Sequence, residues 1–248
     1  YIYTMEQGGL LSQEKIAKRI GVSQLTVSHW QRQDRLPRTI ARAYFKHELP
    51  EEVDFTAELS RLMGYYVAEG YARKEIDFCF NKKEEDLIVD VVNLMQRIFG
   101  LRPQRIKITD NAANIIYQSR PLADFFIRHC GKGAANKHVP TVLFEAPKEY
   151  LLEFLRGIFE GDGYQDKKGK GEITSISKQL IMELNWLCRL HGVKTYMRSF
   201  VAQEGRTING GKPLKAVTAY RLGWGKMANP FSKASKNLAK LPRIMSIK

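Results

Sequence analysis

Two stretches of the chain repeat one order of apolar and polar positions, residues 58–129 and residues 149–239. Each opens with a helix that is apolar around most of its circumference, and two strand-like segments with period-2 alternation follow. A second helix then covers about 84–99 or 178–190. Further elements of the first stretch are two strands and a short helix, at Gln104–Thr109, Asn114–Ser119 and Pro121–Arg128. The pattern predicts an α+β fold built from two tandem αββαββα units, one over 56–135 and one over 136–248.

The two opening helices match each other residue by residue at an offset of 93. The matched pairs are a glycine, an acid, a second glycine and a tyrosine: Gly64 with Gly157, Glu69 with Asp162, Gly70 with Gly163, and Tyr71 with Tyr164. A largely apolar helix with a glycine in its middle suits close packing against its counterpart about a pseudo-twofold axis.

Such packing would bring Glu69 and Asp162 side by side at the C-terminal ends of their helices. Two carboxylates repel each other there, and the helix dipoles disfavour both. A divalent cation would offset this cost, and hard oxygen ligands favour Mg²⁺, with two or three ions expected. Metal-assisted phosphodiester hydrolysis is the chemistry that such a pair supports. The alternative is that each acid is only a surface residue before a glycine turn.

The first 48 residues predict a separate helical module with its linker. Ser12 is a candidate N-cap for a helix with Ile16 and Ala17 on one face, Gly21 ends that helix, and Ser23 begins a second one. The spacing resembles the helix-turn-helix of many bacterial and archaeal DNA-binding proteins. The second helix would present polar groups to base edges and phosphates: Gln24, Thr26, Ser28, His29 and Arg32. A plain helical hairpin with a polar surface is the alternative.

Charge gives these elements a common partner. The chain of 248 residues has 40 Lys and Arg against 26 Asp and Glu, a net charge of +14. The excess of positive charge makes a polyanion the first partner to consider. The hydrophobic fraction of 44% excludes intrinsic disorder, and no apolar run approaches a membrane span. Three isolated cysteines argue against a disulfide framework and a structural zinc site.

The segments Leu62–Gly70 and Leu155–Gly163 resemble the two LAGLIDADG motifs of homing endonucleases. Residues 78–87 and 136–140 are also similar to segments of archaeal intein-encoded enzymes. The resemblance implies a monomeric enzyme whose two sheets form a saddle over the DNA major groove. It also implies Mg²⁺-dependent cleavage of both strands at a long site, with short 3′ overhangs, and catalytic metal ligation by Glu69 and Asp162.

The resemblance also implies basic groups around the metals. Arg120 precedes a predicted helix, Lys226 holds the similar place in the second repeat, and Lys178 opens the helix after a strand. Each is a candidate catalytic cation, with a simple phosphate contact as the alternative; Asn81 and Lys83 are weaker candidates. Alternate strand residues would read bases and phosphates. The candidates are Arg73, Arg105, Lys107, Asn114, Tyr117, Lys168, Lys170, Arg198, Arg206, Lys215 and Arg221.

Two other functions remain open from the sequence: a DNA-binding regulator on this scaffold that no longer cuts, and an RNA maturase. The helix-turn-helix pattern favours duplex DNA, because the major groove of A-form RNA is too narrow for such a helix. Intein-splicing residues are missing at both ends, so we expect a free-standing enzyme or an endonuclease region without its splicing domain. Its expected location is the cytoplasm of an archaeal or bacterial cell, with no membrane partner.

Overall fold

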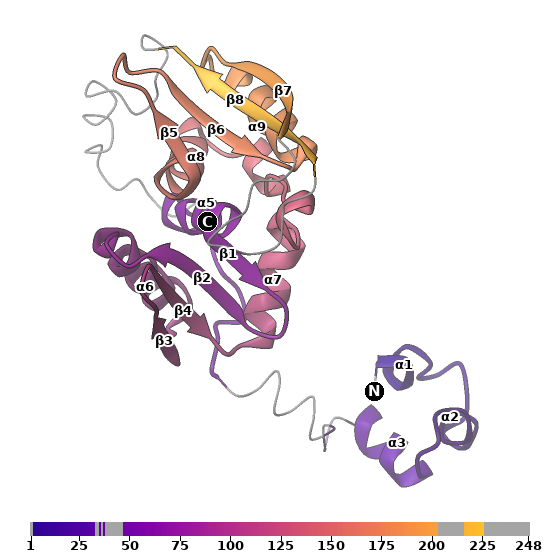
Figure 1. Cartoon of the computed structure of the whole chain (residues 1–248). Coiled ribbons are helices and arrows are strands. Elements are labelled where there is room, and N and C mark those ends of the chain that lie inside the picture. The colour runs from indigo at the N-terminus through magenta and orange to yellow at the C-terminus, as the bar shows by residue number, and fades with distance from the viewer. Residues whose placement is uncertain (1, 33–34, 36, 38–46, 203–215, 226–248) are drawn as a thin grey trace. The chain divides into compact units, whose positions relative to one another are not determined.

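The computed structural model divides into two compact units, Tyr1–Glu48 and Leu49–Lys248, and each is described by itself (Figure 1). The structure describes residues 2–32, 35, 37, 47–202 and 216–225. Three predicted features fall outside this part: the connecting segment after Pro37, the terminal helix of the second repeat, and the side chains of Arg206, Lys215 and Lys226.

The smaller unit contains three short helices, α1 (Ile2–Glu6), α2 (Gln13–Ile20) and α3 (Gln24–Gln31). Ser12 caps α2, because its Oγ accepts from the backbone N–H of Lys15 at 3.4 Å, and Ser23 caps α3 by accepting from Thr26 N–H at 3.1 Å. Gly21 ends α2 with φ +71°, a left-handed conformation that favours glycine. Ile16, Ala17 and Val27 form a small buried core.

The first repeat of the larger unit alternates helices and strands in the expected order. Its elements are α5 (Ala57–Glu69), β1 (Gly70–Ala72), β2 (Ile76–Asn81), α6 (Glu85–Phe99), β3 (Arg105–Ile108), β4 (Ala112–Tyr117) and α7 (Arg120–Cys130). The strands form an antiparallel sheet in the order β1-β2-β4-β3. The β4 strand lies two residues earlier than predicted, since Ser119 leaves the sheet to cap α7 and accepts from Leu122 N–H.

The second repeat follows two short 3₁₀ turns, η1 (Ala134–Asn136) and η2 (Thr141–Phe144). Its elements are α8 (Lys148–Asp162), β5 (Gly163–Gln165), β6 (Gly171–Ser175), α9 (Lys178–Leu190), β7 (Tyr196–Ala202) and β8 (Val217–Trp224). This sheet has the order β5-β6-β8-β7, which is the order of the first sheet. The predicted pair of α+β repeats is therefore confirmed over the described residues.

Each sheet has one face against the helices and one face away from them. In β2, Ile76, Phe78 and Phe80 are buried in the core with residues of α5 and α6, whereas Cys79 and Asn81 point to the other face and are exposed. Because side chains alternate along a strand, the register assigns every strand residue to one face. We call the face that turns away from the helices the open face.

Helices α5 and α8 lie side by side between the two sheets (Figure 1). Their backbones touch at two glycines: a Cβ added at Gly64 would collide with the Phe154 carbonyl oxygen, and one added at Gly157 would collide with the Arg61 carbonyl oxygen. Ser60 Oγ adds a hydrogen bond across the pair by donating to the Tyr150 carbonyl at 2.7 Å. The two repeats are thus joined through a glycine-on-glycine helix crossing.

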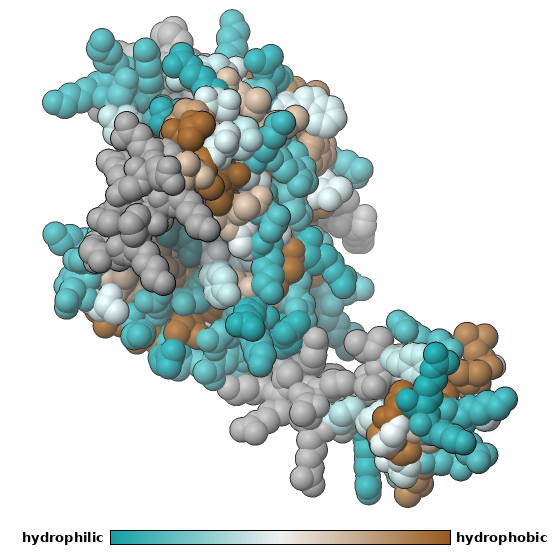
Figure 2. Space-filling model, turned by 45° about the vertical axis from the view of Figure 1, so that its right-hand side comes forward, coloured by the Kyte–Doolittle hydropathy of each residue, from teal (hydrophilic) through white to brown (hydrophobic). Residues whose placement is uncertain are grey.

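Polar side chains cover most of the face of the larger unit that Figure 2 shows. Among the described helices, none combines the length and the apolar character that a bilayer crossing requires.

Substitution of Gly64 by Ala should destabilise the larger unit by about 1–3 kcal/mol, because the new methyl group would meet backbone atoms that cannot rotate away. Gly225→Ala is the matched control, since a Cβ at Gly225 has no heavy atom within 4 Å and its change should be near zero. Urea unfolding of both variants measures the difference. Equal stability of Gly64→Ala and the wild type would show that the helices are not held this close together.

Candidate active site and nucleic-acid interface

Glu69 and Asp162 are the last residues of α5 and α8, so the helix crossing sets where their carboxylates lie. The two helix ends are in contact: a Cβ at Gly161 would lie 2.7 Å from Ala68 Cβ and 3.6 Å from Glu69 Oε1. Glu69 therefore lies against the backbone next to Asp162. Glu69 is half-buried, and Asp162 is open to solvent. The two matched acids of the repeat therefore lie close to each other.

The electrostatics of this site disfavour negative charge. Loss of hydration, together with the neighbouring charges of Asp162 and Glu84, raises the pKa of Glu69 from 4.5 to about 7. Partial desolvation also raises the pKa of Asp162. Since the ionised forms are the costly ones, a bound cation would stabilise both of them.

The donor set fits Mg²⁺. Two carboxylates supply hard oxygen ligands, and Mg²⁺ commonly keeps several waters and takes its other ligands from substrate phosphates. In the part of the chain that the structure describes, no cluster of three or more His, Cys, Asp and Glu side chains could form a closed metal cage. Glu69 and Asp162 would hold the ion, and an open coordination sphere would remain for water and phosphate.

Lys137 is a buried side chain at this site that sequence reasoning missed. Only 4% of the residue is exposed, and its Nζ donates to the carbonyl oxygens of Tyr66 at 2.6 Å and Gly70 at 2.9 Å. The Nζ also lies 3.3 Å from the centre of the Tyr66 ring. Burial lowers the pKa of Lys137 to about 7. Lys137 thus fixes the carbonyls on either side of Glu69, where α5 ends and β1 begins.

Lys178 is connected to the same region through its neighbour. It is the exposed first residue of α9, and the preceding Ser177 caps the helix and donates its Oγ hydrogen to the Lys137 carbonyl at 2.6 Å. In the first sheet Gly70 pairs with Phe78, and in the second Gly163 pairs with Ile173. Phe78 therefore matches Ile173, and Lys83 follows Phe78 at the same distance along the chain as Lys178 follows Ile173. By this structural match the counterpart of Lys178 is Lys83, whereas the offset of 93 in the sequence would give Glu85. The candidate cations Lys83 and Lys178 therefore hold matching places.

The loop before α6 also brings an acid toward the site. Asn81 Oδ1 accepts from Lys83 N–H at 3.0 Å, and Glu84 accepts from Asn81 N–H at 2.9 Å. This turn places Glu84 where its charge reaches Glu69. Arg120 is differently situated, because it follows β4 at the end that pairs with Ile76, and its Nε lies 2.9 Å from Asp124. Arg120 therefore follows the end of β4 opposite to the end that pairs with Asn81, and its catalytic role stays a prediction.

The open face of the first sheet carries three of the strand residues predicted to contact DNA. The β3–β4 register places Arg105 next to Ile116 and Lys107 next to Asn114, all on this face. Arg73 is exposed in the β1–β2 turn. The prediction that Tyr117 belongs to this set is wrong, because its side chain points into the core and is fully buried. Neighbouring side chains of β4 point to opposite faces, so with Ile116 on the open face Tyr117 faces the core. The sequence pattern did not determine this strand register.

The open face of the second sheet combines arginines with aromatic rings. Arg198 lies over the ring of Tyr196 at 5.0 Å, and Arg221 lies over the ring of Phe200 at 4.9 Å. Arg198 and Arg221 stand opposite each other in the register of the neighbouring strands β7 and β8. Lys168 and Lys170 are exposed in the β5–β6 turn, and both of their backbone N–H groups donate to Asp166 Oδ1.

In the smaller unit, Gln24 at the start of α3 and Arg32 directly after its end are exposed, and Ser28 and His29 between them are half-buried. Thr26 is only partly available, because its Oγ1 lies 2.8 Å from Ser23 Oγ within the helix cap.

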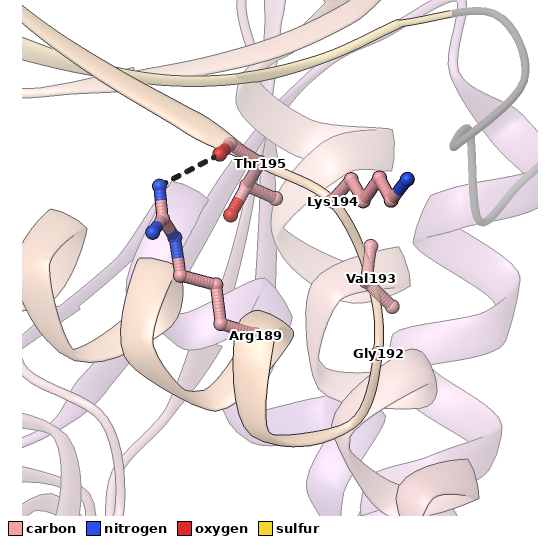
Figure 3. Close-up of a pocket in the computed structure, with 5 residues that line it drawn as sticks. All are labelled: Arg189, Gly192, Val193, Lys194 and Thr195. Atoms are coloured by element: carbon pink, nitrogen blue, oxygen red, sulfur yellow. Dashed lines mark hydrogen bonds between the residues drawn. The ribbon is translucent and has the colours of Figure 1, made fainter.

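A separate cavity of about 380 Å³ lies at the turn between α9 and β7. Its lining residues are Arg189, Gly192, Val193, Lys194 and Thr195, and Figure 3 shows the Arg189 guanidinium donating to the Thr195 carbonyl at 3.2 Å. The lining residues that the structure describes include no carboxylate, so this cavity is distinct from the paired acids.

Comparisons with known proteins bear on the fold that carries this site. Residues 149–217 match the family described as LAGLIDADG-like domain. MJ1054, an uncharacterized protein of Methanocaldococcus jannaschii, is 30% identical over 192 residues, which are 68% of this chain and 21% of that protein. The DNA polymerase II large subunit of Thermococcus kodakarensis is 31% identical over 135 residues, which are 52% of this chain and 7% of that protein. The chain thus spans about a fifth or less of these relatives.

Among solved structures, a variant of the homing endonuclease I-DmoI in complex with its target DNA superposes with a TM-score of 0.50. The alignment covers 75% of this chain and 98% of that protein, with 15% identity, a level at which the likeness concerns the fold. The larger unit therefore has the LAGLIDADG fold, and the sequence of residues 149–217 matches the LAGLIDADG-like domain.

Proposed function

We propose that the chain is a metal-dependent, site-specific DNA endonuclease that cuts both strands of a long recognition site and leaves short 3′ overhangs. The observation that carries this proposal is the meeting of Glu69 and Asp162 at the ends of two crossing helices, each of which leads directly into a sheet with an open, basic face. Two matched acids at the centre and one sheet on each side suit a substrate with two strands.

In this mechanism, Glu69 and Asp162 would hold Mg²⁺ through their carboxylate oxygens. Metal held there would supply activation of water and stabilisation of the leaving oxygen of the phosphodiester. Lys137 keeps the α5–β1 junction in place and so orients Glu69. Lys178 and Lys83 supply positive charge that stabilises the charge that develops on the phosphate. Because one chain supplies both acids and both sheets, we propose that it acts as a monomer. We also propose that it acts in the cytoplasm.

We also propose that α2 and α3 form a DNA-binding helix-turn-helix. The support is local: Gly21 allows the tight turn, the caps fix both helix starts, and Gln24 and Arg32 are exposed at the two ends of α3. The basic residues of this unit would extend the contact with phosphates beyond the region under the sheets.

Asp162→Asn should reduce double-strand cleavage by at least about a thousand-fold, since metal stabilisation of a developing charge is worth several kcal/mol. DNA binding should stay within a few-fold of the wild type, because the open faces keep their cations. Glu149→Gln is the control, an exposed acid in the first turn of the same helix. Plasmid cleavage with and without Mg²⁺, together with gel-shift binding, measures both effects.

Wild-type cleavage by Asp162→Asn would remove Asp162 from the metal site. Specific binding by the wild type without any cleavage would favour the non-cutting regulator.

Stability should depend on pH through Glu69. Its folded pKa of about 7 exceeds the ordinary 4.5, so the unfolded chain loses this proton first and folding stability falls as pH rises from about 4.5 through 7. Glu69→Gln removes this loss. Its free energy of unfolding should exceed that of the metal-free wild type by up to about 3 kcal/mol at pH 8, and by less at pH 5. Mg²⁺ should narrow the gap at pH 8 by stabilising the wild type. Urea unfolding at the two pH values would refute this coupling if the gap did not change.

Deletion of residues 1–48 should shorten the DNA footprint on one side and flatten the salt dependence of binding, because Lys15, Lys18 and Arg32 no longer displace counterions. The position of the cut should not change, since Glu69 and Asp162 set it. Footprinting and binding at several salt concentrations test this expectation. An unchanged footprint and salt slope would assign the smaller unit a role other than DNA binding.

A further inference from the structure

The two open faces carry an acid at the same place in their sheets. Asp77 pairs across the strands with Tyr71, and Glu172 pairs with Tyr164, the two tyrosines that follow the site glycines. Alternation puts both acids on the open face, away from the helices. A carboxylate on a surface that contacts phosphates is unfavourable unless it has a specific partner, because it repels the backbone of DNA.

The two acids differ in their partners. Glu172 Oε1 lies 3.3 Å from an Arg221 nitrogen, and Arg221 Nε donates to Thr174 Oγ1 at 3.2 Å, so this acid is already engaged. Asp77 Oδ1 is shielded from solvent and accepts no hydrogen bond within the described part of the chain. Arg105 shares its face across Ile116 and its positive charge acts on the Asp77 carboxyl group, although no ion pair joins the two side chains among the described residues. Asp77 as a residue is half-exposed on the open face, so a rotation of its carboxyl group would bring this unsatisfied acceptor to the surface.

A shielded acceptor without a donor is costly, so a donor from the ligand would be favoured. In the DNA major groove the donors are the cytosine N4 amino group and the adenine N6 amino group. Adenine also presents its N7 acceptor beside N6, which repels a carboxylate. Cytosine presents only the donor at its edge, and it is the base that Asp and Glu recognise.

We infer that Asp77 is a specificity-determining residue that accepts a hydrogen bond from a cytosine amino group in the half-site under the first sheet. This inference rests on the proposed DNA-binding function and adds to it the identity of one base contact. It also assigns different roles to the matched acids: Asp77 reads a base, and Glu172 orients Arg221.

The test is a selection of bound duplexes from a randomised DNA library by the full chain, with Ca²⁺ in place of Mg²⁺. The wild type should enrich cytosine at one position of one half-site. Exchange of that cytosine for thymine, which presents an acceptor there, should weaken wild-type binding by roughly ten-fold or more. Asp77→Ala should show no penalty for the exchange, and Asp77→Asn should shift the preference toward adenine, whose N6 and N7 suit an amide.

Two control variants separate base reading from indirect effects. Glu172→Gln should keep the cytosine preference, because Glu172 occupies the matched place in the other sheet. Arg105→Ala should reduce the salt dependence and also keep that preference; its loss would mean that Asp77 acts by positioning Arg105. Thermal unfolding checks that each variant is folded.

The inference is overturned if Asp77→Ala and Asp77→Asn both select the wild-type site with the same penalty for thymine. Failure of the proposed function looks different: the wild type itself would then select no sequence, and both proposals would fall together.

Discussion

The backbone contact between α5 and α8 is the constraint on which the rest of the larger unit depends. Gly64 and Gly157 let two helices approach until main-chain atoms touch, which no residue with a Cβ permits at this separation. This contact also positions the sheets, because each helix continues without a loop into the first strand of its sheet. The crossing therefore fixes the separation of the sheets and the separation of the acids together.

That geometry imposes an electrostatic cost at the helix ends. Glu69 is held half-buried near Asp162 and Glu84, and its pKa of about 7 expresses how poorly the site tolerates its charge. Lys137 offsets part of the unfavourable field of the α5 carbonyls by donating to two of them, although burial makes its own charge harder to keep. The site is thus destabilised without a cation, which is the property expected of a pair of metal ligands.

Much of this arrangement could be predicted from the sequence, because a repeat doubles each signal. The offset of 93 is sufficient to identify the matched glycines and acids, and the apolar periods place α6 and α9 within a residue of their ends. Register was harder. Tyr117 reads as a polar candidate on a strand, and only its pairing with Ile76 shows that it faces the core.

Lys137 could not be predicted for another reason. Its role comes from hydrogen bonds to Gly70 and Tyr66, which lie 67 and 71 positions earlier in the chain. Asp77 could not be identified as a candidate either, because the free acceptor at its Oδ1 is seen only once hydrogen bonds among the described residues are known, and the matched Glu172 lies beside Arg221. Local patterns specify elements and their faces, whereas long-range pairing decides which polar groups remain available for a ligand.

The most direct test of the account is the position of the metal. A crystal structure of the full chain with a selected DNA duplex and Mn²⁺ would locate the ions by their anomalous scattering. The account predicts a peak at about 2.2 Å from carboxylate oxygens of both Glu69 and Asp162, next to a DNA phosphate. Ions bound elsewhere, with these two carboxylates free of metal, would contradict it.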